Sequence, residues 1–250
     1  CTRDVLKTLV LLRSRGEVVD PVWEQAARKN LDAMTDTEKR FGHLGYTVDF
    51  DNGNVLWGDS CCGAFGIEPL VRGAAWFGNP AYLQTAIRLA EYYVTHFLEK
   101  GYTCGGVGDA LMAVDSESGY ALFAGLVHLH AATGDPQHLE WACQAADLFS
   151  TWVLRYDARL PPKSPLGKLG IQPRGAVFAN IQNQHGAPGI CTASGVELLR
   201  MHELIGDIRY LQILQDIVEC IPQMVVRRGQ EEVWGDLPPG CISERLMTMD

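Results

Sequence analysis

Apolar side chains recur at steps of three and four residues in three stretches of the chain, residues 82–97, 139–153 and 211–225. This period is typical of an amphipathic α-helix that packs one face on a core and exposes the other. Residues 119–132 differ, because they are apolar on almost every side and rich in small side chains. Such a composition predicts a helix that is packed on both sides. The pattern therefore indicates pairs of helices, each with a buried inner member and a half-exposed outer member.

A short joint precedes each of the three amphipathic stretches. The joints are Gly78-Asn79-Pro80, Gly134-Asp135-Pro136 and Gly206-Asp207-Ile208. The glycine suits the left-handed position just after a helix, and the Asn or Asp side chain can cap the next helix. A proline fits the first helical position, where its missing N–H would have no partner in the helix. Each joint is therefore predicted to connect two antiparallel helices.

The joints repeat at intervals of 56 and 72 residues, so the chain has room for about four helical hairpins. Open helical solenoids have shorter repeats of roughly 33 to 47 residues, whereas unequal repeats with long Gly-rich loops favour a closed ring. We predict an all-α protein, an α/α toroid of helical hairpins that forms one domain over residues 1–250. A ring of six such hairpins needs about 380 residues, so an incomplete (α/α)6 barrel is expected. Residues 48–56 and 175–181 are predicted as short strands or extended loops.

The sequence begins at Cys1 and stops at Met249-Asp250, and we expect it to be a piece of a longer chain. An incomplete ring leaves apolar inner helices along an open edge, and exposed apolar area of that size is normally covered. The partner expected there is a second copy of the chain, forming a homodimer, or the missing hairpins of the same protein.

Charge narrows the classes of partner. Thirty acidic residues against 21 basic residues give a net charge of −9, which disfavours nucleic acid and anionic membrane surfaces. No apolar run reaches the roughly 18 residues that a membrane span needs. The eight cysteines include no CxxC pair and no signal peptide is visible, so a reduced, cytoplasmic protein is expected.

The loops before the inner helices carry the candidate binding chemistry. In an α/α toroid these loops open at one mouth and are expected to bring polar residues together. Four such loops are rich in Asp, Glu, His, Asn and Trp and poor in Lys. Carboxylates bind sugar hydroxyls and exchange protons, while indole rings stack on the C–H groups of a pyranose. The predicted substrate-binding residues are Trp57, Asp59, Asp109, Asn183, Trp234, Asp236 and Glu244.

The joints and the stretch Asp115-Ser116-Glu117-Ser118-Gly119-Tyr120-Ala121-Leu122 resemble the six-hairpin glycosidase superfamily. That group includes unsaturated glucuronyl hydrolases and related β-glucuronidases and arabinofuranosidases. The resemblance covers residues 55–245 at the level of architecture, and it implies an (α/α)6 toroid that acts on sugars. In the glucuronyl hydrolases an acidic residue at the N-terminus of an inner helix protonates the sugar, and Asp115 occupies the like position here.

Glycoside hydrolysis uses two carboxyl groups, one as general acid and the other as base or nucleophile. Asp115 is the predicted principal acid/base, with Glu117 and His185 as further catalytic candidates. The alternative is structural: Asp115 caps a helix, Glu117 completes its first turn, and His185 orders its own loop. Three further histidines lie in helical patterns and are predicted to be structural, His128, His130 and His202.

We therefore predict a glycoside hydrolase that uses carboxylate general acid/base catalysis and no cofactor. Its predicted substrate is an oligosaccharide, and oligosaccharides that contain uronic acid are included in this prediction. Two alternatives stay open. One is a polysaccharide lyase of the same toroid fold with His185 as its base. The other is a non-catalytic helical scaffold or carbohydrate-binding fragment.

The adjacent cysteines Cys61 and Cys62 suggest a zinc site, with Cys191 or His185 as further ligands. Some arabinofuranosidases of the superfamily use a zinc-bound cysteine near a Cys-Cys pair, but the residue order and the neighbouring Glu do not match that pattern here. Residues 185–190 are similar to a turn motif of the zinc-bearing lanthionine cyclases, without their Cys-Cys-His ligand set. We expect no metal.

Overall fold

The computed structural model describes residues 1–106, 112–182 and 195–242. In this part of the chain the long helices form four consecutive hairpins, which confirms the all-α prediction. The pairs are α1 (Thr2–Ser14) with α2 (Pro21–Phe41), α3 (Ile67–Phe77) with α4 (Pro80–His96), α5 (Ser116–Thr133) with α6 (Pro136–Ser150), and α9 (Val196–Ile205) with α10 (Ile208–Cys220).

Short elements fill the connections between the hairpins. They are the strands β1 (Thr47–Val48) and β2 (Val55–Trp57), the helix α7 (Pro165–Lys168), and the 3₁₀ turns η1 (Cys62–Gly66), η2 (Leu98–Lys100), η3 (Ile221–Met224) and η4 (Glu231–Trp234). The two strands pair antiparallel, with Thr47 opposite Trp57. Residues 175–181 stay extended, and one isolated bridge joins Val177 to Val153.

The predicted joints form as their local chemistry requires. Gly78, Gly134 and Gly206 each follow an inner helix in the left-handed conformation, with φ between 63° and 71°. The next residue then accepts a hydrogen bond from a backbone amide in the first turn of the outer helix. The distances are 3.1 Å for Asn79, 2.9 Å for Asp135 and 2.9 Å for Asp207. The same cap precedes α2, where Asp20 accepts from the amide of Val22 at 2.8 Å.

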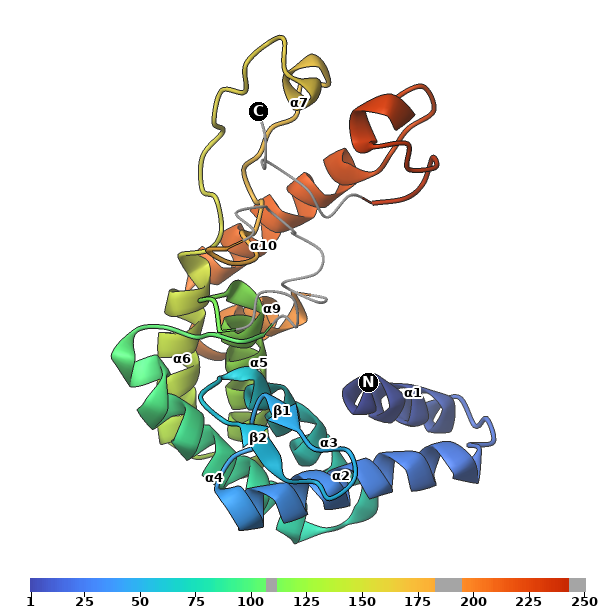
Figure 1. Ribbon diagram of the computed structural model, residues 1–250, viewed down its shortest axis with the longest axis vertical. Coiled ribbons are helices and arrows are strands. Elements are labelled where there is room, and N and C mark those ends of the chain that lie inside the picture. Colours follow the sequence, from blue (N-terminus) through green and yellow to red (C-terminus); the bar gives the residue numbers. More distant parts are fainter. Residues whose placement is uncertain (107–111, 183–194, 243–250) are drawn as a thin grey trace.

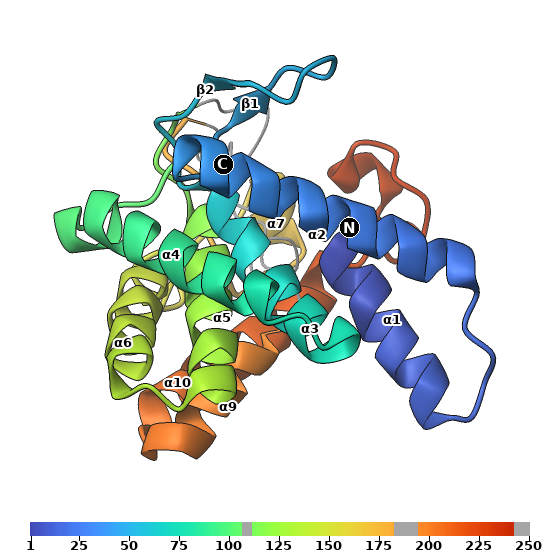
Figure 2. The ribbon, with the colours of Figure 1, turned by 90° about the horizontal axis from the view of Figure 1, so that it is seen from below.

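The inner helices α1, α3, α5 and α9 pack in that order, and the hairpins follow one another along an arc (Figures 1 and 2). Helix α5 is buried from Ser118 to Leu129, because α3, α6 and α9 all pack against it. The all-round apolar composition of residues 119–132 thus has the predicted cause. The outer helices keep a polar face toward solvent.

Two separate apolar cores stabilise the described part of the chain. The larger core lies between the hairpins and includes Leu31, Leu70, Leu89, Leu122 and Phe149. The smaller core lies beyond α10, where Leu154, Leu166, Ala176, Cys220, Met224, Val226 and Trp234 pack together. Among the described helices, not one combines the length and apolar character that crossing a membrane requires.

Candidate active site

Backbone hydrogen bonds join the segments that precede three inner helices. The amide of Cys61, before α3, donates to the carbonyl of Cys104 at 3.0 Å. The amide of Asp115, before α5, donates to Thr103 at 3.1 Å, and the amide of Ser116 donates to Ala179 at 2.9 Å. These three loops therefore meet at one end of the molecule, as the toroid hypothesis expects. The fourth predicted loop lies elsewhere, since Ile242 bridges Val225 beside the smaller core.

A cavity of about 640 Å³ opens beside η1 and the first turns of α1, α3 and α5. Its polar lining includes Arg3, Asn30, Glu68, Glu117 and Tyr120. Its apolar lining includes Met34, Leu44, Phe65, Pro69, Ala121 and Ala124. A concave, mainly apolar cavity with a few convergent polar groups is the usual form of a small-molecule site.

Charged side chains occupy equivalent positions at the starts of the inner helices. The second helical residue is Arg3 in α1, Glu68 in α3, Glu117 in α5 and Glu197 in α9. The first three of these residues line the cavity. The sequence analysis identified only Glu117 in this set. Aligning the inner-helix starts of the repeats would have revealed the others, because each is a charged residue beside an apolar run.

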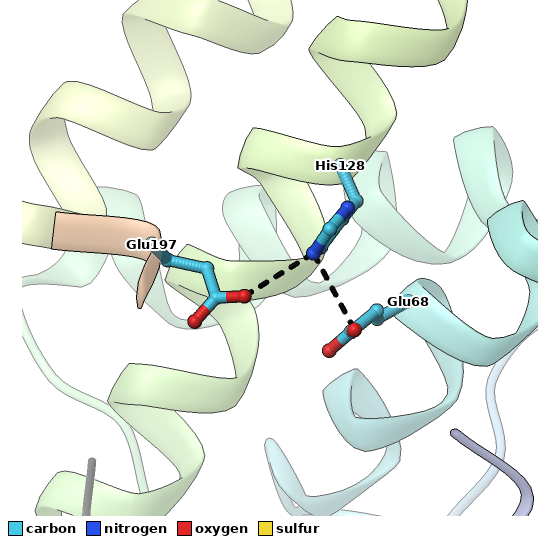
Figure 3. A group of neighbouring side chains, drawn as sticks. All are labelled: Glu68, His128 and Glu197. Atoms are coloured by element: carbon cyan, nitrogen blue, oxygen red, sulfur yellow. Dashed lines mark hydrogen bonds and ion pairs between the residues drawn. The ribbon is translucent and has the colours of Figure 1, made fainter. Parts of the chain in front are cut away.

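Behind the cavity, a buried histidine connects two of these glutamates (Figure 3). His128 Nε2 of α5 lies 3.4 Å from Glu68 Oε1 of α3 and 3.2 Å from Glu197 Oε1 of α9. All three residues are buried. His128 was predicted to be structural, and it does hold three inner helices together. It does not line the cavity.

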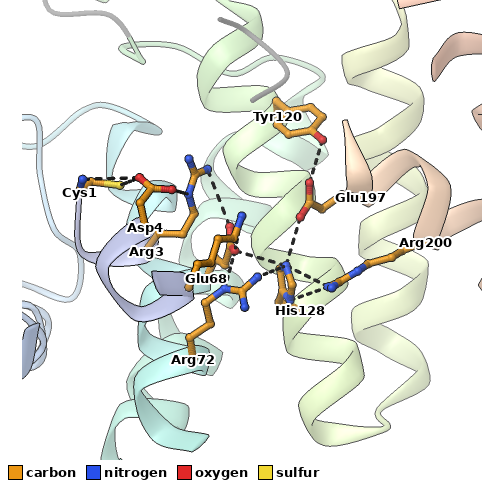
Figure 4. Close-up of polar contacts among 10 residues, drawn as sticks. Cys1, Arg3, Asp4, Glu68, Arg72, Tyr120, His128, Glu197 and Arg200 are labelled. Atoms are coloured by element: carbon orange, nitrogen blue, oxygen red, sulfur yellow. Dashed lines mark hydrogen bonds and ion pairs between the residues drawn. The ribbon is translucent and has the colours of Figure 1, made fainter. Parts of the chain in front are cut away.

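Two arginines and a tyrosine complete this cluster (Figure 4). Arg72 Nε donates to Glu68 Oε1 at 2.7 Å, and Arg72 Nη2 lies 3.1 Å from His128 Nε2. Arg200 Nη1 lies 3.0 Å from His128 Nδ1. The Tyr120 hydroxyl donates to Glu197 Oε2 at 2.9 Å. We name Glu68, Arg72, Tyr120, His128, Glu197 and Arg200 the buried charge cluster.

Helix α1 adds two cations to the same cluster. Arg3 Nη1 lies 4.0 Å and Lys7 Nζ 3.7 Å from the carboxylate of Glu68. The polar contacts of Glu68 therefore come from three inner helices, α1, α3 and α5. A buried carboxylate needs such partners, because burial otherwise penalises its charge.

The pKa of Glu197 reflects these contacts. Burial alone would raise it, but the hydrogen bonds from His128 and Tyr120 outweigh burial and lower the pKa to about 2. Glu197 is therefore ionised throughout the neutral range. Tyr120 shifts the opposite way: burial and the neighbouring Glu197 charge raise its pKa, so its hydroxyl keeps its proton.

The ligand atoms of Glu68, His128 and Glu197 lie within 4.8 Å of one another, a spacing that could suit a metal ion. The surrounding charges argue against one. Arg72 and Arg200 already place guanidinium groups against His128, and Arg72 also pairs with Glu68. A divalent cation would have to displace or repel these charges. The buried charge cluster therefore fits an internal ion-pair network better than a metal site.

Asp115, the predicted acid/base, is the fully buried N-cap of α5. Its Oδ1 accepts from the amide of Ser118 at 2.6 Å, and its Oδ2 accepts from the amide of Gly106 at 2.8 Å. Burial raises the pKa of Asp115, and these hydrogen bonds oppose that shift. Asp115 does not line the cavity, whereas the half-buried Glu117 does. The geometry thus favours the structural alternative for Asp115 and a site role for Glu117.

Replacement of Asp115 tests this placement. Asp115→Ala is expected to lower the free energy of unfolding by about 2–3 kcal/mol, because two buried amides lose their acceptor. Asp115→Asn keeps one accepting oxygen but turns its NH2 donor toward the other amide N–H, so it should also cost about 2 kcal/mol. The matched control is Asp135→Ala, which removes the exposed cap of α6 and should cost only about 1 kcal/mol. Urea denaturation measures all three. Equal losses for the two alanine variants would contradict the buried role of Asp115.

Four further predicted residues fall within the described part of the chain, and none of these four lines the cavity. Trp57 lies on β2, where its ring meets Tyr46 edge to face at 5.9 Å, and Asp59 is exposed after that strand. Trp234 is only 6% exposed in the smaller core, so its ring offers no face to a sugar. Asp236 is exposed after η4. The other candidates lie outside the described residues: Asp109, Asn183, His185 and Glu244.

The described residues bring no cysteine into a metal-binding group. Cys61 is buried, and Cys62 lines the cavity. Burial, together with the charges of Asp115 and Glu117, raises the pKa of Cys62 to about 11. A thiol with that pKa is protonated at neutral pH and is therefore a poor nucleophile. Cys191 and His185, the other proposed ligands, lie outside the described residues.

No protein-family model and no curated protein matches this sequence. Solved structures do match the fold. Cellobiose 2-epimerase from Bacillus thermoamylovorans superposes with a TM-score of 0.58 at 14% identity, over 97% of this chain and 64% of the epimerase. Unsaturated glucuronyl hydrolase from Bacillus sp. GL1, responsible for the degradation of glycosaminoglycan, gives a TM-score of 0.48 at 15% identity, over 83% of this chain and 59% of the hydrolase.

The chain thus spans 64% of the length of the epimerase that it matches. At this identity the similarity shows the fold: a partial α/α toroid of the kind found in the six-hairpin glycosidase superfamily. The predicted fold class is confirmed, and the predicted resemblance is confirmed at the level of the fold. The epimerase that shares this fold is a carbohydrate-active enzyme.

Proposed function

We propose that this chain carries the substrate cavity of a carbohydrate-active enzyme and hydrolyses a glycosidic bond, with Glu117 as the proton-transferring group. One observation carries the proposal. Glu68 and Glu117 hold the same position in two successive inner helices, and both line one cavity. Glycoside hydrolysis requires two carboxyl groups facing one substrate. The oligosaccharide substrate and a covering partner, a second copy or further hairpins of the same protein, belong to this proposal.

The surroundings of the two glutamates suggest different roles. Arg72 Nε lies 2.7 Å and Lys7 Nζ 3.7 Å from the carboxylate of Glu68, so two cations face this carboxylate. An ionised carboxylate can stabilise the positive charge that develops on the sugar, or activate a water molecule. Glu117 then supplies the proton to the leaving oxygen. Such proton transfer contributes typically about 10²–10⁴-fold in rate.

We prefer hydrolysis to epimerisation because of the position of His128 in the buried charge cluster. Epimerisation at a carbon beside a carbonyl needs a base in contact with the sugar. His128, the one histidine in the cluster, has an arginine nitrogen within 3.1 Å of each ring nitrogen and does not line the cavity. Among the described residues, no histidine lines the cavity, and its acidic groups are the carboxylates of Glu68 and Glu117.

Product analysis tests the proposal. The chain is incubated with neutral and uronate-containing disaccharides, and the products are identified by chromatography and NMR. New reducing ends support hydrolysis. An isomer formed without cleavage, or an unsaturated product, would replace hydrolysis by epimerase or lyase activity. Binding without conversion would favour the non-catalytic alternative, and neither binding nor conversion of any sugar would overturn the proposal.

A further inference from the structure

One large aromatic side chain in the cavity wall is partly exposed to solvent. Phe65 of η1 lines the cavity and is 45% exposed. Its neighbours in the same turn, Gly63, Ala64 and Gly66, are buried. Leaving part of a phenyl ring in water forgoes the stabilisation that its burial would contribute. An apolar ring kept open inside a concave cavity is a feature of binding sites.

The packing of η1 accounts for the direction of this ring. An added Cβ at Gly63 would lie 1.8 Å from the Tyr93 hydroxyl, and one at Gly66 would lie 2.4 Å from Leu44 Cδ1. The side of the turn that carries Gly63 and Gly66 therefore packs tightly on Tyr93 and Leu44. The amide of Leu44 donates a hydrogen bond to the same Tyr93 hydroxyl at 3.1 Å, and this bond holds the two supporting residues in place. With that side closed, Phe65 is left facing the cavity.

We propose that Phe65 is a substrate-binding residue whose ring stacks on the C–H face of a pyranose. This inference rests on the proposed function. Sugars expose C–H groups on the faces of the ring and hydroxyls around its edge. A phenyl ring can cover the C–H groups without burying an unpaired hydroxyl. The hydroxyls then meet the polar lining of the same cavity, Glu117 and Glu68 among them.

Phe65 thus takes the stacking role that the sequence analysis assigned to tryptophans. Trp234 is closed inside the smaller core, and Trp57 lies on β2 outside the cavity lining. The ligand class is a neutral pyranose of a disaccharide or longer oligosaccharide, because the contact is apolar.

Calorimetric titration with maltose, cellobiose and mannobiose tests the inference. Phe65→Ala is expected to weaken binding by about five- to fiftyfold, since the sugar loses an aromatic contact surface. Phe65→Tyr and Phe65→Trp keep a ring and should bind within about threefold of the wild-type chain. The matched control is Phe50→Ala, because Phe50 is fully exposed and outside the cavity lining. Thermal unfolding of each variant confirms that it is folded.

The outcomes separate this inference from the proposed function. If the wild-type chain binds a disaccharide and Phe65→Ala binds it equally well, the stacking role is overturned and the proposed function stands. Equal losses for Phe65→Ala and Phe50→Ala would also overturn the stacking role. If the wild-type chain binds none of the three neutral disaccharides, a neutral pyranose ligand is overturned. The wider product analysis then decides the proposed function.

Discussion

Glu117→Gln is expected to lower kcat at least about a hundredfold on any oligosaccharide that the chain hydrolyses. The substitution keeps the size of the side chain and removes the proton that the carboxyl group would transfer. A hundredfold loss is the lower end for a general acid or base. Glu117 is the second residue of α5 and lines the cavity beside Glu68. Affinity for the substrate should change little, so the loss should appear in kcat rather than in KM.

The control for this variant is Glu99→Gln. Glu99 lies in η2, is exposed and does not line the cavity, so activity should stay at the wild-type level. Circular dichroism and thermal unfolding show whether both variants are folded. Full activity in a folded Glu117→Gln variant would contradict the proton-transfer role and move it to another carboxyl group.

Glu197→Ala is expected to lower the free energy of unfolding by about 3–5 kcal/mol, because it removes one partner of a buried charge network. The substitution leaves His128 without its 3.2 Å contact and the Tyr120 hydroxyl without its acceptor. Urea denaturation at neutral pH measures the loss. Glu203→Ala is the matched control on the same helix, since Glu203 is exposed and its removal should cost less than about 0.5 kcal/mol. Similar losses for the two variants would contradict the network.

The contribution of the Glu197 carboxylate to stability should decrease at acidic pH. The pKa of Glu197 is about 2 in the folded chain against an ordinary value of 4.5. A lowered folded-state pKa contributes stability that is present above pH 4.5 and is lost as the pH falls toward 2. The wild-type chain should therefore lose its stability advantage over Glu197→Gln across this window. Comparing these two chains cancels the other carboxyl groups, including Asp115, whose raised pKa acts in the opposite direction. A difference that does not change with pH would contradict the assignment.

The hairpins could be predicted from the sequence because their determinants are local. A joint glycine reaches the left-handed conformation by itself, and the next Asn or Asp caps a helix that begins beside it. Gly78-Asn79 and Gly134-Asp135 act in this way whatever the rest of the chain does. The inner helix at residues 119–132 could also be predicted from the sequence, because a helix that is packed on both sides needs apolar residues on all its faces.

The sequence did not predict which of Asp115 and Glu117 lines the cavity. Asp115 is the N-cap of α5 and Glu117 its second residue, so their side chains point in different directions, but the sequence does not say which of them faces a cavity. Tertiary packing turned Asp115 toward the amide of Gly106 and left Glu117 at the cavity. The Trp-Gly-Asp runs at residues 57–59 and 234–236 show the same limit. One lies at an exposed strand end, and the other has its tryptophan in the smaller core.

The sequence by itself determined the helices and the joints that connect them, since both depend on contacts between near neighbours in the chain. Only the tertiary structure decided which side chains meet in the buried charge cluster. His128 is 60 residues from Glu68 and 69 residues from Glu197 in the sequence, yet its Nε2 lies within 3.4 Å of a carboxylate oxygen of each. No local sequence pattern predicts these contacts. They follow from the packing angle of three helices, which the whole core sets.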